Sequence, residues 1–77
     1  EKVLETYTIP VGSPVAKKKI MDVGWGKHCV IVSIERDGVS ITPKGDTVIK
    51  EGDEVVVLVS QRRFSRDIEK LEQMIKG

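Results

Sequence analysis

Residues 43–59, PKGDTVIKEGDEVVVLV, decide the fold of this chain. They hold two Gly-Asp pairs, Gly45-Asp46 and Gly52-Asp53, and this dipeptide is typical of turns. We expect a turn at each pair and a short bridge or strand at Val48-Ile49 between them. The valine-rich run Glu54–Val59 that follows predicts a strand, the clearest in the chain.

A hairpin is predicted immediately upstream. Cys29–Ile34 is nearly continuously apolar, which is typical of a central strand covered on both faces. Asp37-Gly38 then favours a tight hairpin turn, with Gly38 as a turn-forming residue. Val39 and Ile41 belong to the returning strand, which we expect to end at Pro43 because proline cannot donate to a strand ladder.

The N-terminal third predicts a strand followed by a short helix. Residues 3–9 alternate imperfectly and are rich in β-branched and aromatic side chains, which favours a strand. Ser13 and Pro14 fit the N-cap and first position of a helix. Its apolar positions would be Ala16, Ile20 and Val23, and Gly24 would end it.

A second helix closes the chain, with Ser65 as its expected N-cap. Phe64, Ile68, Leu71 and Ile75 form its apolar stripe, and Gly77 stands where a C-terminal glycine belongs. The fold class is therefore α+β: a small β-α-β-β-β-β-α domain with a largely antiparallel sheet, one short helix after the first strand and a C-terminal helix.

Length and composition restrict the function. Seventy-seven residues make one small domain, residues 1–77, with a marginal core that a second copy or another domain can complete. The net charge of +1 argues against nucleic-acid binding by bulk electrostatics. The apolar runs are too short for membrane insertion, and one cysteine excludes a disulfide framework. Because the chain begins at Glu1 without methionine, we expect it to be a fragment of a longer polypeptide.

No set of residues forms a catalytic site, so we expect no enzyme and no metal. His28 and Cys29 are adjacent, and their side chains would point to opposite faces of a strand. Asp46, Asp53 and Glu54 are open to two interpretations. They could form a carboxylate cluster for a cation, or they could be turn residues with solvated carboxylates, which we favour.

Basic residues are the candidate ligand contacts. Lys17, Lys18 and Lys19 near a helix N-terminus could receive a phosphate-bearing ligand, or they could form a solvated basic face. Arg36 is the fourth candidate for an anionic ligand. The run that contains Arg62, Arg63 and Arg66 admits the same two interpretations. Trp25, between two glycines, is either an anchor on a partner or a cap over the core. The candidate partner contacts are Ala16, Ile20, Trp25, Val39 and Ile41.

The order of these motifs resembles the RCK C-terminal domain, also called the TrkA C-terminal domain. The likeness runs from about residue 8 to residue 59, and its specific part is Pro-x-Gly-Asp-Thr-x-(Leu/Ile)-x-x-Gly-Asp at residues 43–53. The family usually has glycine where Lys17 stands, so helix packing and any ligand contact there can differ. The final helix lies beyond the resemblance, in residues 60–77.

The resemblance implies a cytosolic regulatory domain of a potassium channel or transporter, without catalytic activity of its own. Such a domain typically follows a Rossmann-like domain, forms a homodimer and passes ligand occupancy to a membrane pore. It implies a cyclic dinucleotide, such as cyclic di-AMP, or a divalent cation as regulatory ligand. Two alternatives stay open. The domain could belong to a chloride channel or other antiporter, or it could be a structural dimerisation module that binds no ligand.

Overall fold

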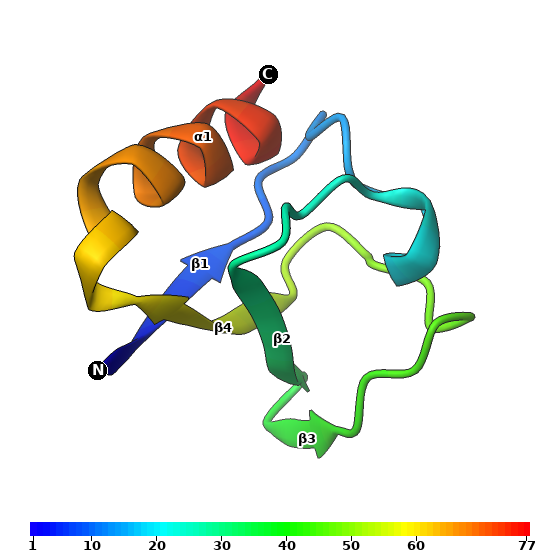
Figure 1. Cartoon of the computed structure of the whole chain (residues 1–77). Coiled ribbons are helices and arrows are strands. Elements are labelled where there is room, and N and C mark those ends of the chain that lie inside the picture. The colour runs from blue at the N-terminus through cyan, green and yellow to red at the C-terminus, as the bar shows by residue number, and fades with distance from the viewer.

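The structure is a computed structural model that describes all residues from 1 to 77. One four-stranded sheet carries the C-terminal helix on one of its faces, and long loops fill the rest of that side (Figure 1). The elements in chain order are β1 (Lys2–Thr8), the 3₁₀ turn η1 (Ile20–Asp22), β2 (Cys29–Arg36), β3 (Val39–Ile41), β4 (Glu54–Ser60), the 3₁₀ turn η2 (Gln61–Arg63) and α1 (Phe64–Lys76). This architecture confirms the predicted α+β class with an antiparallel sheet.

The sheet has the strand order β1-β4-β2-β3, and all its pairings are antiparallel. The valine-rich strand β4 therefore lies between β1 and β2, which explains why it is the most apolar segment of the chain. The predicted bridge between the two Gly-Asp turns is also present, as an isolated pairing of Val48 with Lys19.

The core lies between the sheet and α1. Alternate residues of β4, Val55, Val57 and Val59, are fully buried on the side that faces the helix. Leu71 and Ile75 of α1 are buried with them. Full burial of one such side chain contributes about 1.5–3 kcal/mol. The period-2 pattern of the strand and the helical stripe thus meet in one hydrophobic cluster.

The helix predicted to begin at Ser13 and to end at Gly24 is wrong in extent. Only the three residues of η1 are helical, and the segment before them is a series of turns. The reason is local: Lys17 has a φ of 72°, which a right-handed helix cannot contain. Its N–H donates to the carbonyl of Ile49 at 2.7 Å instead of to a helical partner.

Ser13 does not cap a helix but connects two distant segments. Its hydroxyl donates to the carbonyl of Ile75 near the end of α1, at 2.5 Å. The same oxygen accepts from the N–H of Val15 at 3.3 Å. The buried hydroxyl therefore ties the loop after β1 to the C-terminal helix.

The prediction that β2 is covered on both faces is wrong for this chain alone. Val30 and Val32 are 52% and 40% exposed, because α1 and the loops cover only the other face. The pairing of β2 with β4 also shifts between Ile31 and Ser33, which places Val32 in a β-bulge. The continuous apolar run therefore indicates an uncovered sheet face.

The final helix begins two residues earlier than predicted, because its N-cap is Arg63 instead of Ser65 and its first residue is Phe64. Ser65 is exposed, and no side chain caps the helix. The turn η2 leads directly into α1, and the Phe64 N–H donates to the carbonyl of Gln61, so the backbone satisfies this donor. Phe64 itself is only half-buried and lies outside the hydrophobic cluster.

Candidate functional site

The three candidate lysines lie on a loop that is fastened by main-chain hydrogen bonds. Residues 17–21 pair with residues 45–49 through four of these bonds, at 2.7–3.0 Å. All three lysine side chains are exposed. The ammonium groups are thus available to an anion, but the α-helix N-terminus expected to assist them is absent, because only the three-residue 3₁₀ turn η1 begins there.

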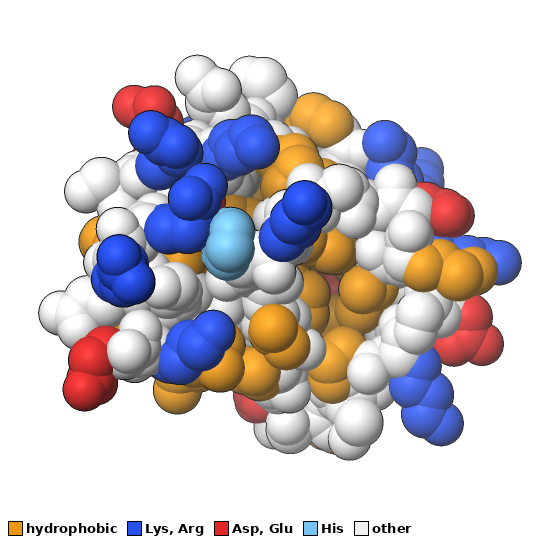
Figure 2. All heavy atoms as spheres, in the orientation of Figure 1, with side chains coloured by type: hydrophobic (Ala, Val, Ile, Leu, Met, Phe, Trp, Pro, Cys, Tyr) orange, Lys and Arg blue, Asp and Glu red, His pale blue; other side chains and the backbone are white.

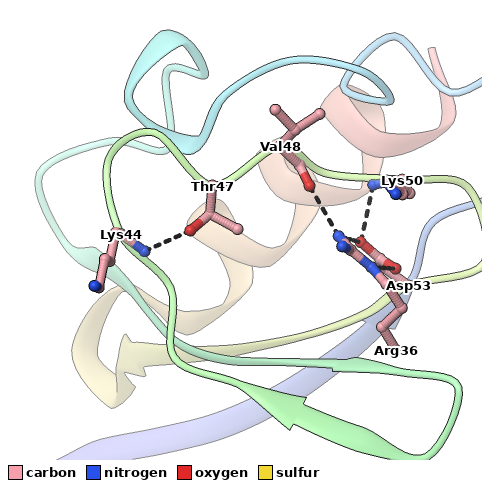
Figure 3. Close-up of polar contacts among 6 residues, drawn as sticks. All are labelled: Arg36, Lys44, Thr47, Val48, Lys50 and Asp53. Carbon is pink, nitrogen blue, oxygen red and sulfur yellow. Dashed lines mark hydrogen bonds and ion pairs between the residues drawn. The ribbon is translucent and has the colours of Figure 1, made fainter.

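Arg36 is held by a buried carboxylate. Its Nε and Nη2 donate to the two carboxylate oxygens of Asp53 at 2.9 and 2.7 Å, and Nη2 also donates to the carbonyl of Val48 at 2.8 Å (Figure 3). A third bond to Asp53 comes from the Lys50 N–H at 2.8 Å. A phosphate could reach Arg36 only in competition with Asp53.

The carboxyl group of Asp53 has a lowered pKa. Burial by itself would raise this pKa, but the hydrogen bonds from Arg36 and from the Lys50 N–H, together with their charges, outweigh it. The same hydrogen bond raises the pKa of Arg36. Both groups therefore stay charged, and the pair is a fixed structural connection between the hairpin and the second Gly-Asp turn.

The three carboxylates considered for a cation do not gather. Asp53 is 1% exposed and paired with Arg36, whereas Asp46 and Glu54 are exposed. The favoured interpretation of solvated turn carboxylates is therefore wrong for Asp53. Gly52 beside it has a φ of 87°, so the turn uses a conformation that glycine adopts without strain. No cluster of three metal-ligating side chains is present.

Four of the five candidate partner contacts belong to the protein's own packing. Ala16, Ile20, Trp25 and Ile41 are partly buried against the hydrophobic cluster. The indole Nε1 of Trp25 donates to the carbonyl of Ile20 at 3.1 Å, which favours the cap over the core. Val39, at 61% exposed, is the member of the set that presents a large apolar surface.

The sequence analysis missed an apolar surface on the uncovered side of the sheet, which we call the open sheet face. It consists of Leu4 on β1, Val56 and Leu58 on β4, and Val30 and Val32 on β2. Leu4 is paired with Leu58, and Leu58 with Val30, so the apolar residues form a row across three strands. The available signal was the apolar residues at the outer positions of β2 and β4, together with the single outer Leu4 of β1.

His28 and Cys29 do not form a catalytic couple. His28 is exposed, whereas Cys29 is partly buried against the hydrophobic cluster. Burial raises the pKa of the Cys29 thiol, assisted by the negative charge of Asp67 and opposed by Lys70. The thiol is thus less ionised than an ordinary cysteine at neutral pH, and the thiolate is the reactive form. What the chain offers is binding surface: an apolar face and groups of fixed or exposed cations.

These features define a small α+β domain with an uncovered apolar sheet face and exposed cations, and its sequence specifies the family. Residues 4–72 match the family model of the TrkA-C domain, so the chain belongs to the TrkA-C domain family. No curated protein sequence matches it. None of its helices combines the length and the hydropathy that a membrane span requires.

Solved structures support the same fold. An RCK domain with cda is similar to the chain, with a TM-score of 0.77 and 22% identity over 94% of this chain and 96% of the other. The RCK_C domain dimer of S. agalactiae BusR in complex with c-di-AMP has a TM-score of 0.72 and 21% identity, over 94% of this chain and 93% of the other. S. agalactiae BusR in complex with its busAB-promotor DNA has a TM-score of 0.70 and 21% identity, over 96% of this chain but only 37% of the other. At these identities the likeness establishes the fold.

Proposed function

We propose that this chain is the ligand-sensing and dimerisation domain of a longer protein that controls potassium transport, and that its ligand is cyclic di-AMP. The observation that carries the proposal is the open sheet face, because a domain of the TrkA-C family with an uncovered apolar face has a surface for a second copy. The similar domain of BusR is a dimer with c-di-AMP, which supports both parts. The role is regulatory and not catalytic, and the domain acts on the cytosolic side of the membrane.

The two copies would meet through the open sheet face. Leu4, Val30 and Val32 are 60%, 52% and 40% exposed. Leu4, Leu58 and Val30 are paired in one row without a charged residue between them, and Val32 follows in the β-bulge. Burying such a surface against a copy of itself removes apolar area from water at about 25 cal/mol per Å². Val39 lies on the other face of the sheet, with Ile41, and remains a candidate contact outside this interface.

Light scattering of the purified chain tests this interface. We expect a dimer at micromolar concentration, and the double variant Leu4→Ser/Val30→Ser should be a folded monomer. The matched control Met21→Ser removes an equally exposed apolar side chain from the loop side and should leave the dimer intact. A monomeric wild-type chain, or a dimer unaffected by the double variant, would contradict the proposed interface.

The phosphates of the ligand would be bound by Lys17, Lys18 and Lys19, whose side chains are exposed on a rigid main-chain ladder. Replacement of all three by glutamine should weaken cyclic di-AMP binding in calorimetric titration at least tenfold. The control variant Lys44→Gln removes one exposed cation elsewhere, and should change affinity little. Unaltered affinity in the triple variant would show that the ligand binds at another site. If the wild-type chain gives no heat with cyclic di-AMP or divalent cations, the structural dimerisation module is favoured.

The proposed parent protein is tested in cells. An antibody against this chain should detect a polypeptide much larger than 8.6 kDa on a denaturing gel. Deleting the segment that encodes these residues should abolish the response of potassium flux to cyclic di-AMP. A response of chloride or sodium flux in the same strains, with potassium flux unchanged, would favour the channel or antiporter alternative.

A further inference from the structure

A polar hollow lies where η2 joins α1, opposite the start of β2. Its volume is about 390 Å³, and it is lined by Trp25, Gly26, Lys27, His28, Cys29, Arg63, Asp67 and Lys70. A second hollow of about 350 Å³ adjoins it, because both include His28 and Arg63; Ser60 and Arg62 complete the second. We call the two together the α1 hollow. Figure 2 shows Lys and Arg side chains gathered around the single histidine on this face.

The charge of the α1 hollow is concentrated. Four cations line it, Lys27, Arg62, Arg63 and Lys70, against the single carboxylate of Asp67. The hollow thus has a net charge of at least +3, in a chain whose total is +1. A concave wall with one sign of charge focuses the electrostatic field and attracts a counter-ion. The expected occupant is therefore an anion.

Asp67 places a buried hydrogen-bond acceptor without a partner in the wall of the α1 hollow. This residue is 7% exposed, and its Oδ2 has no hydrogen-bond partner. The nearest cation is Arg63, whose Nε lies 3.7 Å away and is likewise buried without a partner. That distance is too long for a direct hydrogen bond. Buried polar groups without partners are rare in folded proteins and call for a specific cause.

One chemical group satisfies both atoms. A hydroxyl can accept a hydrogen bond from the Nε–H of Arg63 and at the same time donate one to Oδ2 of Asp67. Of the three remaining cations, Lys27 and Arg62 are then free for a phosphate, and Lys70 adds to the positive charge of the same hollow. A lone phosphate dianion does not fit as well, because it places acceptor oxygens next to the Asp67 carboxylate.

We propose that the α1 hollow binds a phosphate monoester that carries a hydroxyl, the chemistry shared by sugar phosphates and mononucleotides. The hydroxyl bridges Arg63 and Asp67, and the phosphate lies between Lys27 and Arg62. The site shares no residue with the open sheet face or with the three lysines. It is therefore independent of the cyclic di-AMP function, and either can fail alone.

Trp25 makes the binding measurable, because it is the only tryptophan and lines the hollow. Its fluorescence is followed in the 77-residue chain during titration with ribose 5-phosphate, AMP and inorganic phosphate, with NMR of the amides of residues 25–29 and 62–70 as a second readout. Ribose 5-phosphate should bind at least tenfold more tightly than inorganic phosphate. If AMP binds more tightly than ribose 5-phosphate, the site recognises a mononucleotide. If the two bind with equal affinity, the site recognises the sugar phosphate alone. No response of either readout to any ester overturns the proposal.

Two variants separate the contacts from general electrostatics. Arg62→Gln should weaken ribose 5-phosphate about tenfold, whereas Lys44→Gln, which removes an exposed cation elsewhere, should not. Asp67→Asn should strengthen binding of inorganic phosphate, because it removes a repulsive charge, and should weaken binding of ribose 5-phosphate. If Asp67→Asn raises the affinity for ribose 5-phosphate and for inorganic phosphate by the same factor, Asp67 does not contact the hydroxyl, and the proposed bridge is wrong. Circular dichroism confirms that each variant is folded.

Discussion

Replacing Asp53 by asparagine tests the connection between the hairpin and the second Gly-Asp turn. The carboxylate is 1% exposed and accepts three hydrogen bonds, two from Arg36 and one from the N–H of Lys50. Asparagine has nearly the same shape but keeps one acceptor oxygen and has no charge. It can retain the bond to the backbone, and it loses the bidentate ion pair.

The size of the effect follows from the burial of the pair. Breaking a buried ion pair costs about 3–5 kcal/mol. The Arg36 side chain is 25% exposed and can be rehydrated, so we expect the lower end, about 3 kcal/mol. A domain of this size shifts its melting temperature by about 4–8 °C per kcal/mol, which gives a decrease of roughly 12–24 °C. The total stability is only roughly 4–12 kcal/mol at about 0.05–0.15 kcal/mol per residue, so the loss is severe.

Urea denaturation followed by circular dichroism at several pH values is the assay. The pKa of Asp53 is lowered in the folded state, so its stabilising effect is fully present above the unfolded pKa of about 3.9 and is lost as the pH falls through the folded value. The difference between the wild type and the Asp53→Asn variant should therefore be constant from pH 7 to pH 5 and should shrink below about pH 4.

The other Gly-Asp pair provides the matched control. Asp46 is exposed, and Asp46→Asn should change the free energy of unfolding by no more than about 0.5 kcal/mol. If both variants lose the same stability, or if the difference persists unchanged at pH 3, the ion pair between Arg36 and Asp53 does not stabilise the fold.

Three further predictions concern single sites. Gly52→Ala should lower the free energy of unfolding, measured by heating, by about 1–2 kcal/mol because the φ of Gly52 is 87°. Gly24→Ala, at a residue without a positive φ, should cost little, and equal effects would exclude backbone strain as the cause. Ser13→Ala should lower the free energy of unfolding in urea by about 1–3 kcal/mol, because a buried carbonyl of α1 loses its donor. Ser65→Ala, at an exposed site, serves as control, and an unchanged stability of Ser13→Ala would contradict the hydrogen bond to the helix. Desolvation, with the negative charges of nearby acidic groups, raises the pKa of Tyr7 to about 12, so ultraviolet titration of this single tyrosine should have its midpoint there. The free energy of unfolding should fall as the pH rises from about 10 to about 12, whereas a titration midpoint near 10 would show an exposed phenol.

Local signals in the sequence were sufficient for the strands. The alternation in β1, the Asp37-Gly38 turn and the valine-rich β4 each depend on residues a few positions apart, and all three elements are present. The helix predicted at Ser13 failed because its competitor is distant in sequence. The Lys17 N–H donates to the carbonyl of Ile49, and the Ile49 N–H donates to the carbonyl of Lys18; these main-chain bonds outweigh a favourable cap and a proline.

The candidate site depended even more on distant residues. The pairing of Arg36 with Asp53 joins positions 17 residues apart, and either residue alone looks like a solvated charge. Asp67 stands four residues before Leu71, on the buried face of α1, so its position in the helix indicated burial although its charge did not. Arg62 and Arg63 were recognised as possible anion contacts, but their companions Lys27 and Lys70 come from other segments.

The ladder between residues 17–21 and 45–49 has a consequence for how this domain can diverge. Its four bonds join main-chain atoms only, so almost any non-proline side chain at Lys18, Lys19 or Val48 leaves it intact, whereas the φ of 72° restricts the choice at Lys17. The recognition chemistry of this loop can therefore be exchanged without redesigning the fold. A library randomised at Lys18, Lys19 and Val48 should contain mostly folded proteins with altered ligand preference, which makes the loop a suitable place to engineer new sensors.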